Sequence, residues 1–133
     1  ASADGDGASS TTTVDDDGAL VLGPLARHVL DHQIHLEMAP TCNVQIGAVD
    51  SVGEHPIGPF LRAGLSVGIN TYNRLMSHVS PSSELLAVAT EHALSVEEME
   101  RLVTNAAMAS FAPYDDRLRL VRDVIRPGFT SLA

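Results

Sequence analysis

The residues best suited to chemistry lie in a polar loop that follows a short apolar run at 65–69. The end of the run and the loop read GINTYNRLMSH over 68–78. The change from apolar to hydrogen-bonding side chains predicts a buried strand that opens into a functional loop. Loops of this kind commonly carry an acid, a base or a metal ligand, yet no carboxylate occurs between Ile69 and Ser83. The loop therefore lacks the carboxylate that a site of this kind would be expected to carry.

Three other groups of residues could bind a metal ion or attack a substrate. His28 and His32 have the spacing that puts two imidazoles on one face of a helix, with His35 close by. Without a cysteine or an acidic motif, such a pair is more often a solvated or partly buried helix flank. Cys42 has no basic neighbour that would lower its pKa, which favours an inert thiol. The acidic run at 15–17 lacks the alternating ligands and distal glutamate of an EF-hand, which favours a solvated turn.

Composition restricts the classes of function. The chain has 133 residues, a hydrophobic fraction of 44% and an aromatic fraction of 4%, which predicts one globular domain with an aliphatic core. Seventeen acidic residues face eight basic ones, all of them arginines, for a net charge of −9. This charge disfavours attraction to phosphate backbones and to anionic membranes. We therefore expect neither a nucleic-acid partner nor a membrane partner.

Cysteine usage and hydropathy predict the compartment. The single cysteine, Cys42, cannot form an intrachain disulfide, which is compatible with a reducing environment. No apolar run approaches the ~20 residues that span a bilayer, and the first 18 residues lack the pattern of a signal peptide. We expect a cytoplasmic chain with a flexible acidic and Ser/Thr-rich tail or loop at 1–18, followed by a structured region at 19–133.

Helices and strands must position these residues. From Leu20 onward, the spacing of apolar side chains indicates where those elements lie. A Ser-Val-Glu-Glu sequence at 95–98 predicts a helix start with a capping box, and Gly64 suits a helix end. The segment at 41–54 is expected to be a loop with at most one short turn. The remaining expected elements are a helix at 23–32, a strand at 35–38, a helix at 56–63, a strand at 65–69, and helices at 83–90, 95–110 and 113–126, the last ended by Pro127-Gly128.

The order of these elements predicts an α/β architecture. Strands separated by helices favour parallel pairing through crossover connections. Two parallel strands cannot stand alone, because each leaves an unpaired edge and both faces need cover. The sequence thus predicts a portion of a larger α/β fold.

Four motifs resemble, in order and spacing, motifs of the adenosine deaminase family. Together they extend the resemblance over about residues 20–128. The motifs are LEMAPTCNVQIGAV at 36–49, EHP at 54–56, NTYNRLMS at 70–77 and NAAMASF at 105–111.

The resemblance implies the C-terminal portion of a (β/α)8 metal-dependent hydrolase barrel, with its last two strands and terminal helices. A whole barrel needs ~250 residues, so the chain would be incomplete on its own. The family uses one Zn²⁺ ion at the barrel mouth to hydrolyse adenosine to inosine and ammonia, in purine metabolism. The metal lowers the pKa of its bound water. A glutamate handles the ring proton, and a histidine and an aspartate orient the water.

Carried over residue by residue, the family's chemistry has few counterparts here. Its zinc histidines, catalytic glutamate and water-orienting histidine belong to segments upstream of Leu20. Its zinc aspartate falls on Tyr72, whose unperturbed pKa of about 10 makes the phenol a poor replacement. Its neighbouring substrate-contacting residue falls on Asn73, which could bind the purine or could satisfy nearby backbone groups. Further departures from the family pattern are Ala39, Cys42, His78 and Val79.

We therefore expect no catalytic residue, no metal ligand and no cofactor in this chain alone, and Asn73 as the one candidate substrate contact. The expected function is an adenosine-deaminase-like fragment that is inactive by itself, because acid–base catalysis needs groups within hydrogen-bond reach of the substrate. One alternative is half of a split barrel that needs a separate N-terminal partner. Another is a non-catalytic acidic interaction module, or a homo-oligomer that pairs its strand edges. The third is the product of a truncated gene that folds poorly.

Overall fold

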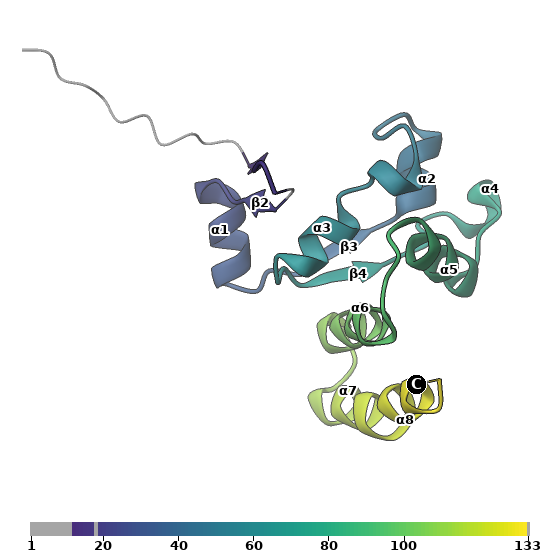
Figure 1. Ribbon diagram of the computed structural model, residues 1–133. Helices are drawn as coiled ribbons and strands as arrows, with labels where there is room; N and C mark the ends of the chain where they lie inside the picture. Colours follow the sequence, from purple (N-terminus) through teal and green to yellow (C-terminus); the bar gives the residue numbers. More distant parts are fainter. Residues whose placement is uncertain (1–11, 18, 133) are drawn as a thin grey trace, which may run out of the picture.

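The computed structural model describes residues 12–17 and 19–132, and Figure 1 shows their arrangement. Two pairs of short strands and a series of helices follow one another along the chain. The strands are β1 (Thr13–Val14), β2 (Leu20–Val21), β3 (Leu36–Met38) and β4 (Val67–Ile69). The helices are α1 (Pro24–Asp31), α2 (Pro40–Gln45), η1 (Val52–Glu54), α3 (Ile57–Arg62), α4 (Arg74–Ser77), α5 (Pro81–Glu91), α6 (Val96–Ala109), α7 (Tyr114–Leu120), η2 (Val121–Ile125) and α8 (Arg126–Thr130).

Strands β3 and β4 form the parallel pair that the order of elements predicts. Leu36 lies opposite Val67, and Met38 lies opposite Ile69. The pair is two strands wide and forms no closed barrel within the described residues. Because β3 and β4 run in the same direction, the segments that follow them leave from the same end of the sheet.

One face of this sheet carries the main hydrophobic core. Leu36, Met38, Val67 and Ile69 share that face, because opposite residues in a parallel pair point to the same side. They pack with side chains from the flanking helices. The buried members of the core are Ile57 and Leu61 of α3, Leu65 before β4, Val67 of β4, Val88 of α5 and Leu102 of α6.

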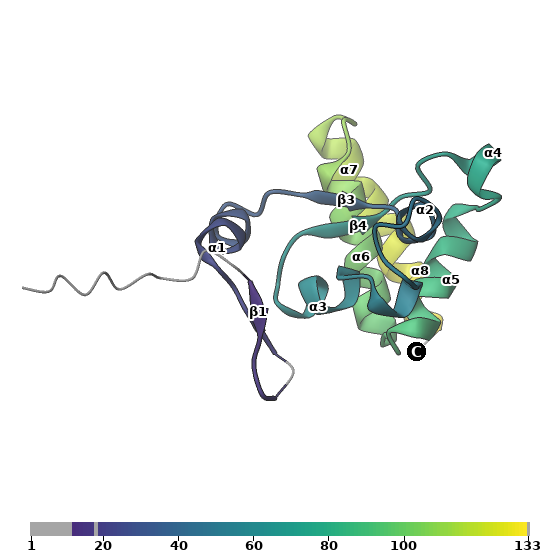
Figure 2. The ribbon, with the colours of Figure 1, turned by 90° about the horizontal axis from the view of Figure 1, so that it is seen from above.

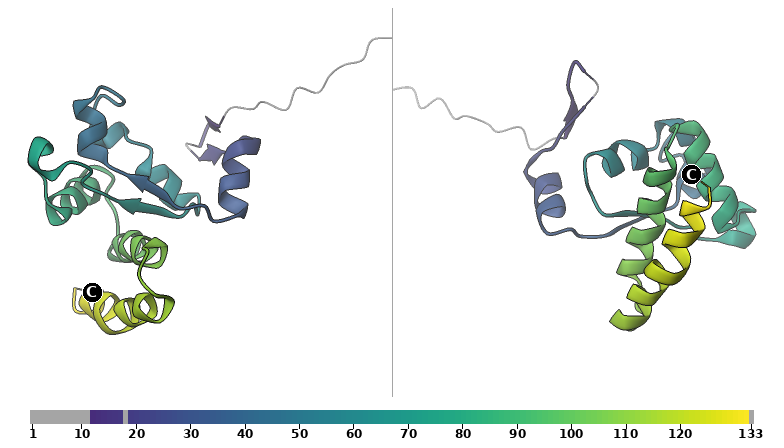
Figure 3. Two further views of the ribbon diagram at one scale, coloured as in Figure 1. Left: turned by 180° about the vertical axis from the view of Figure 1, so that it is seen from behind. Right: turned by 60° about the horizontal axis from the view of Figure 1, so that its bottom comes forward.

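Helix α6 joins this core to a second, smaller one. Figure 2 shows α6 running across the direction of β3 and β4, and Figure 3 shows α7 and α8 alongside α6 on its other side. Ala107, Val121 and Ile125 are the buried residues of the second core. The Ser95 hydroxyl accepts the Glu98 N–H, and Glu98 accepts the Ser95 N–H, so the predicted capping box begins α6.

Three sequence expectations about helices were wrong. Residues 41–45 of the expected loop at 41–54 belong to helix α2, which begins at Pro40 because proline suits the first turn. Helix α5 begins at Pro81, two residues before the expected start, with Ser80 as its capping residue. The last helix does not end at Pro127-Gly128 but continues to Thr130. A π-helical segment precedes it, and Pro127 falls in the first turn of α8, where a missing N–H costs little.

The N-terminal region contains a small hairpin where the sequence predicts a tail or loop. Strands β1 and β2 pair antiparallel, with Thr13 opposite Val21. Asp15 accepts the backbone N–H groups of Asp17 and Ala19, so the exposed acidic run forms the turn of this hairpin. Residues 1–11 and 18 of the expected tail lie outside the described part of the chain.

None of the helices in the described ranges 12–17 and 19–132 is long and apolar enough to cross a lipid bilayer.

Candidate functional site

The candidate site lies where β3 and β4 end. Helix α2 follows β3 after one residue, and the loop at 70–73 with helix α4 follows β4. Figure 1 shows α2, α4 and the start of α5 gathered at this end of the strands, while α1 lies at the opposite end. The backbone N–H of Asn70 donates to Met38 O at 2.7 Å, which joins the two departing segments.

Tyr72 lies in the loop after β4, at the surface of the described part of the chain. Its side chain is 82% exposed, and its backbone has a φ of +52°. This left-handed conformation is uncommon for a bulky residue, and glycine, asparagine or aspartate adopts it at lower cost. The loop geometry therefore suits a smaller side chain than the one it carries.

Asn73 uses its side chain to begin a helix. Its Oδ1 accepts the backbone N–H of Met76 at 3.2 Å, so Asn73 is the N-cap of α4. Of the two roles that the sequence leaves open for Asn73, the structure shows the satisfaction of a backbone group. The amide nitrogen of the side chain is the part that remains for a ligand.

Helix α2 is fastened to α5 by a buried carboxylate. Glu84 is 1% exposed, and its Oε1 accepts the backbone N–H of Thr41, at the start of α2, at 2.6 Å. The first N–H groups of a helix lack partners within the helix, so the carboxylate satisfies a donor and balances the helix dipole. Its second oxygen, Oε2, is buried without a hydrogen-bond partner within the described residues.

A buried histidine holds the other side of α2. His55 is 4% exposed; its Nδ1 accepts the Ile57 N–H and its Nε2 lies 3.2 Å from Asn43 Oδ1. Since Nδ1 accepts, Nε2 carries the proton and donates to Asn43. Burial lowers the pKa of His55 below its ordinary value of 6.5; nearby His92 lowers the pKa further, and Glu84 opposes both. His55 is therefore neutral at pH 7 and has a structural role at the entry to α3.

His92 and Arg62 connect α5 to the elements around it. His92 Nε2 donates to Val52 O at 2.8 Å, and its ring lies against Gly58, where an added Cβ would stand 2.5 Å from Nδ1. Arg62 pairs with Glu98 through two nitrogens and donates to His92 O. These contacts set the positions of η1, α3 and α5 around the sheet.

The face of the sheet opposite the core carries polar side chains near the start of the strands. His35 Nδ1 lies 2.9 Å from Ser66 Oγ. Its ring covers Gly68, where an added Cβ would lie 2.9 Å from His35 Nε2. Burial lowers the pKa of His35, and Glu37 opposes the shift. This pair lies at the end of the strands away from Tyr72, so the fold does not bring it to the candidate site.

The structure also places the other candidates from the sequence. The rings of His28 and His32 lie 4.1 Å apart on exposed positions, and His32 Nδ1 bonds to His28 O, as expected for a helix flank. Cys42 is a free thiol of intermediate burial in α2. His78 is exposed and ends α4 in the left-handed region. Within 12–17 and 19–132, no three His, Cys, Asp or Glu side chains lie close enough to hold a metal ion.

Sequence reasoning missed the clamp that Glu84 and His55 form around α2. Glu84 occupies the first turn of an amphipathic helix, where an acidic residue is ordinary. Its partner, Thr41, is 43 residues away along the chain. The available signal was the Asn43 and His55 pair, two polar residues near apolar positions, but their contact depends on how the loop at 46–51 folds back.

Comparison with known proteins agrees with the motifs and with the fold. The family model for adenosine deaminase matches residues 8–127. Adenosine deaminase 1 of Streptomyces coelicolor is 42% identical over 119 residues, which are 90% of this chain and 30% of that protein. Adenosine deaminase of Mycobacterium tuberculosis is 41% identical over 119 residues, 90% of this chain and 33% of that protein. The chain therefore spans about a third of the length of these relatives.

Solved structures show the same fold at low sequence identity. An adenine deaminase from Arthrobacter aurescens matches with a TM-score of 0.75 and 22% identity, over 87% of this chain and 33% of the other. An N6-methyl-AMP deaminase from Arabidopsis thaliana matches with a TM-score of 0.65 and 21% identity, over 79% and 30%. The chain belongs to the adenosine deaminase family. It has the fold of the C-terminal portion of a (β/α)8 barrel, which is incomplete on its own.

Proposed function

We propose that this chain is the docking and framework portion of an adenosine-deaminase-type barrel and that it is inactive by itself. The complete barrel would hydrolyse adenosine to inosine and ammonia. Family membership and a coverage of about a third of the relatives support the first part of the proposal. The observation that carries the second part is the loop after β4, where the exposed Tyr72 occupies the position that the resemblance assigns to a zinc ligand and Asn73 caps a helix.

The described residues do not fit a zinc ion. At the family's metal position, Tyr72 supplies a phenol, whereas zinc sites use histidine, thiolate or carboxylate ligands. No cluster of three such ligands occurs in the part of the chain that the structure describes. We therefore assign this chain no metal-bound step and no catalytic residue.

The chain's own residues position the segments that follow the strands at the barrel mouth. Glu84 holds the start of α2, and His55 holds its middle through Asn43. Asn73 sets the start of α4 after β4. Helices α2 and α4 lie close together, and Gln45 Nε2 reaches Ser77 O at 3.5 Å. This framework would support a substrate or a partner chain without taking part in proton transfer.

A mixing experiment tests the proposal. The segment of Streptomyces coelicolor adenosine deaminase 1 that lies outside the matched region is expressed as a separate chain and combined with this chain and Zn²⁺. The loss of adenosine absorbance then measures turnover. We expect none from this chain alone, none from the mixture, and turnover from the mixture that contains Tyr72→Asp. Turnover by this chain alone would refute the inactivity, and a docked but inactive Tyr72→Asp mixture would refute the assignment of Tyr72.

A second candidate function is a non-catalytic interaction module or self-association, and one observation favours it. Leu75 and Met76 on α4 are 80% and 72% exposed, next to the exposed Tyr72. Three large apolar or aromatic side chains on so short a segment are typical of a contact surface. Light scattering over a range of concentrations distinguishes a self-associating chain from a monomer.

A cytoplasmic location belongs to the same proposal. The support for it is limited to the single cysteine of the chain, which leaves no intrachain disulfide to be maintained.

A further inference from the structure

Two imidazoles share one exposed face at the end of helix α1. His28 lies in the last turn of the helix, and His32 is its C-cap. Both residues are exposed, and the centres of their rings lie 4.1 Å apart. Residues four apart on a helix are neighbours on its surface, whereas Val29 and Leu30 pack against the main core. The two rings are therefore free to turn toward a common point in solvent.

Two hydrogen bonds to one carbonyl oxygen fix the geometry of the pair. The backbone N–H of His32 donates to His28 O at 3.1 Å, which keeps this turn helical. Nδ1 of His32 lies 2.9 Å from the same oxygen. Because a carbonyl oxygen only accepts, Nδ1 carries the proton in the neutral ring and Nε2 keeps its lone pair. Histidines that bind metals almost always donate their other ring N–H in this way. The spacing alone favours a solvated helix flank, and this hydrogen bond is what the structure adds.

The charges around the pair favour a cation. The last carbonyl groups of a helix give its C-terminal end a partial negative charge, and the pair lies at that end of α1. Arg27 and Asp31 precede the two histidines, and their opposite charges offset each other. The net charge of the whole chain is −9, which attracts cations to its surface.

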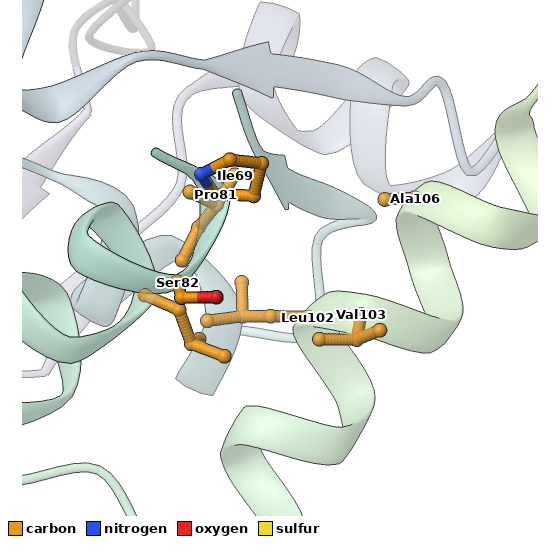
Figure 4. Close-up of a pocket in the computed structure, with 7 residues that line it drawn as sticks. Ile69, Pro81, Ser82, Leu102, Val103 and Ala106 are labelled. Carbon is orange, nitrogen blue, oxygen red and sulfur yellow. The ribbon is translucent and has the colours of Figure 1, made fainter. Parts of the chain in front are cut away.

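The hollow beside β4 has the opposite character. It has a volume of about 230 Å³ and lies between α5 and α6, at the far edge of β4, away from β3. Figure 4 shows most of its lining, which comes from β4, α5 and α6: Ile69, Pro81, Ser82, Leu102, Val103 and Ala106. The lining supplies one hydroxyl and no imidazole, thiol or carboxylate. Ligands for a metal ion are therefore found at the surface of α1 and not in this hollow.

We propose that His28 and His32 chelate one late divalent transition-metal ion, Ni²⁺ or Cu²⁺, with water in the remaining coordination positions. Imidazole suits both ions, and both favour tetragonal coordination by nitrogen and oxygen. Zinc sites in proteins commonly have three or four protein ligands, so a pair of histidines suits Zn²⁺ less well. Helix α1 lies at the opposite end of the strands from the loop with Tyr72, as Figure 1 shows, so this site is separate from the family's metal position.

The distance between the rings suits a chelate. Metal–nitrogen bonds of about 2 Å place two nitrogens on one ion roughly 3 Å apart. Rings whose centres lie 4.1 Å apart reach that separation by rotation of the exposed side chains, with the backbone of α1 in place. The bound ion joins two residues of one helical turn. It therefore stabilises the end of α1, because an ion that binds only the folded form shifts the equilibrium toward it.

Isothermal titration calorimetry of the whole chain with Ni²⁺ tests the proposal. Ni²⁺ is the probe because, unlike Cu²⁺, it does not oxidise a free thiol such as Cys42. We expect one ion per chain, with the affinity weakened by about tenfold or more in His28→Ala and in His32→Ala. His78→Ala removes an exposed histidine at the end of α4 and should leave the affinity unchanged. Unchanged binding in either variant of the pair would overturn the proposal. One ion per two chains would also overturn it, because the ion would then lie between two copies.

A matched variant changes the spacing and keeps the composition. Arg27→His combined with His28→Arg moves one imidazole back by one residue, so the two histidines no longer share a face of α1. Its affinity for Ni²⁺ should fall as far as that of His28→Ala. Hydrogen exchange of the segment at 24–32, followed by mass spectrometry, should slow on addition of Ni²⁺ in the unaltered chain and not in this variant. Equal slowing in both would overturn the proposal. Urea melting shows whether the variant is folded, and the calorimetry of the single variants stands if it is not.

Discussion

At the scale of single residues, the proposed inactivity depends on the loop after β4. Tyr72 holds the position at which the family resemblance places a zinc aspartate, and its side chain is 82% exposed. Asn73 occupies the neighbouring position, and its side-chain oxygen accepts the Met76 N–H. Both residues belong to the backbone geometry of the loop: Tyr72 has a φ of +52°, and Asn73 is the N-cap of α4. Neither supplies the charged group that metal binding at this place would need.

Restoring the carboxylate should not restore a metal site in this chain. We expect Tyr72→Asp to bind Zn²⁺ no more tightly than the unaltered chain, because one carboxylate without two or three further ligands is a weak site. The variant should fold, since aspartate tolerates the φ of +52° better than tyrosine does. Isothermal titration calorimetry with Zn²⁺ measures the difference. Tight 1:1 binding by the variant would show that further ligands are present.

The carboxylate of Glu84 makes a different prediction. Glu84→Ala removes the acceptor for the Thr41 N–H and opens a cavity, so we expect the free energy of unfolding to fall by about 2–3 kcal/mol. Glu84→Gln keeps one oxygen for that N–H and removes a buried charge, so its loss should be about 1 kcal/mol or less. Urea denaturation of the three proteins gives the comparison. Equal losses for the two variants would mean that the hydrogen bond on Thr41 is not what Glu84 contributes.

At the scale of elements, helix positions depend on a few close contacts. Gly58 in α3 packs against the His92 ring of α5, with no room for a methyl group between them. Ala106 of α6 meets Gly68 of β4 in the same way, and the neighbouring Asn105 donates to Val67 O. Small residues at these points let the helices approach closely enough to bury the core around Ile57 and Leu102.

Two glycine substitutions should therefore have opposite effects. Gly58→Ala would place a Cβ 2.5 Å from His92 Nδ1 and 3.2 Å from its Cβ, so we expect a loss of about 1–3 kcal/mol in the free energy of unfolding. Gly128→Ala, in α8, meets no atom within 4 Å and should gain up to about 1 kcal/mol from helix propensity. Thermal or urea melting compares the two. A stabilising Gly58→Ala would show that the His92 ring can move aside without cost.

At the scale of the whole molecule, the incomplete barrel explains the distribution of apolar surface. One face of the β3–β4 pair is buried under helices, whereas the far edge of β4 has a hollow beside it. Apolar side chains on α4 are exposed at the end of the strands. A portion of a larger fold has such surfaces, because its core continues into the part that it lacks.

Two histidines predict how the stability of the whole molecule varies with pH. The pKa values of His55 and His35 are lowered from 6.5, mainly by burial. Below pH 6.5 the unfolded chain therefore binds more protons at these sites than the folded one. The neutral forms stabilise the fold fully above pH 6.5, and that contribution is lost as the pH falls from 6.5 through the folded pKa values. We expect urea denaturation at pH 5.5 to show a smaller free energy of unfolding than at pH 7.5.

A variant isolates the contribution of these histidines. His35→Asn removes one of the two groups and should reduce the difference between pH 7.5 and pH 5.5. The pKa of Glu98, beside Arg62, is lowered from 4.5, so the loss of its ion pair belongs to a lower pH range. A pH dependence that is unchanged in His35→Asn would assign the whole effect to His55.

The sequence by itself determined much of the local structure and the descent of this chain. Periodicity predicted α1, α3 and α6, because side-chain spacing reports which face is buried. The order of strands and helices predicted the parallel pairing of β3 with β4. The capping box at Ser95 was confirmed because it depends on residues three apart. The motifs at 36–49, 54–56, 70–77 and 105–111 predicted the family, which the comparisons confirm.

Only the tertiary structure decided which distant residues meet. Thr41 and Glu84 are far apart in sequence, as are Val67 and Asn105, and no local pattern predicts either hydrogen bond. Helix α2 was missed because its stability comes from the clamp around it, not from its own short sequence. A single-sequence pattern reports the preference of a segment for one conformation, whereas long-range contacts depend on how whole elements pack. The edge of β4 and the hollow beside it became visible only when α5 and α6 were in place.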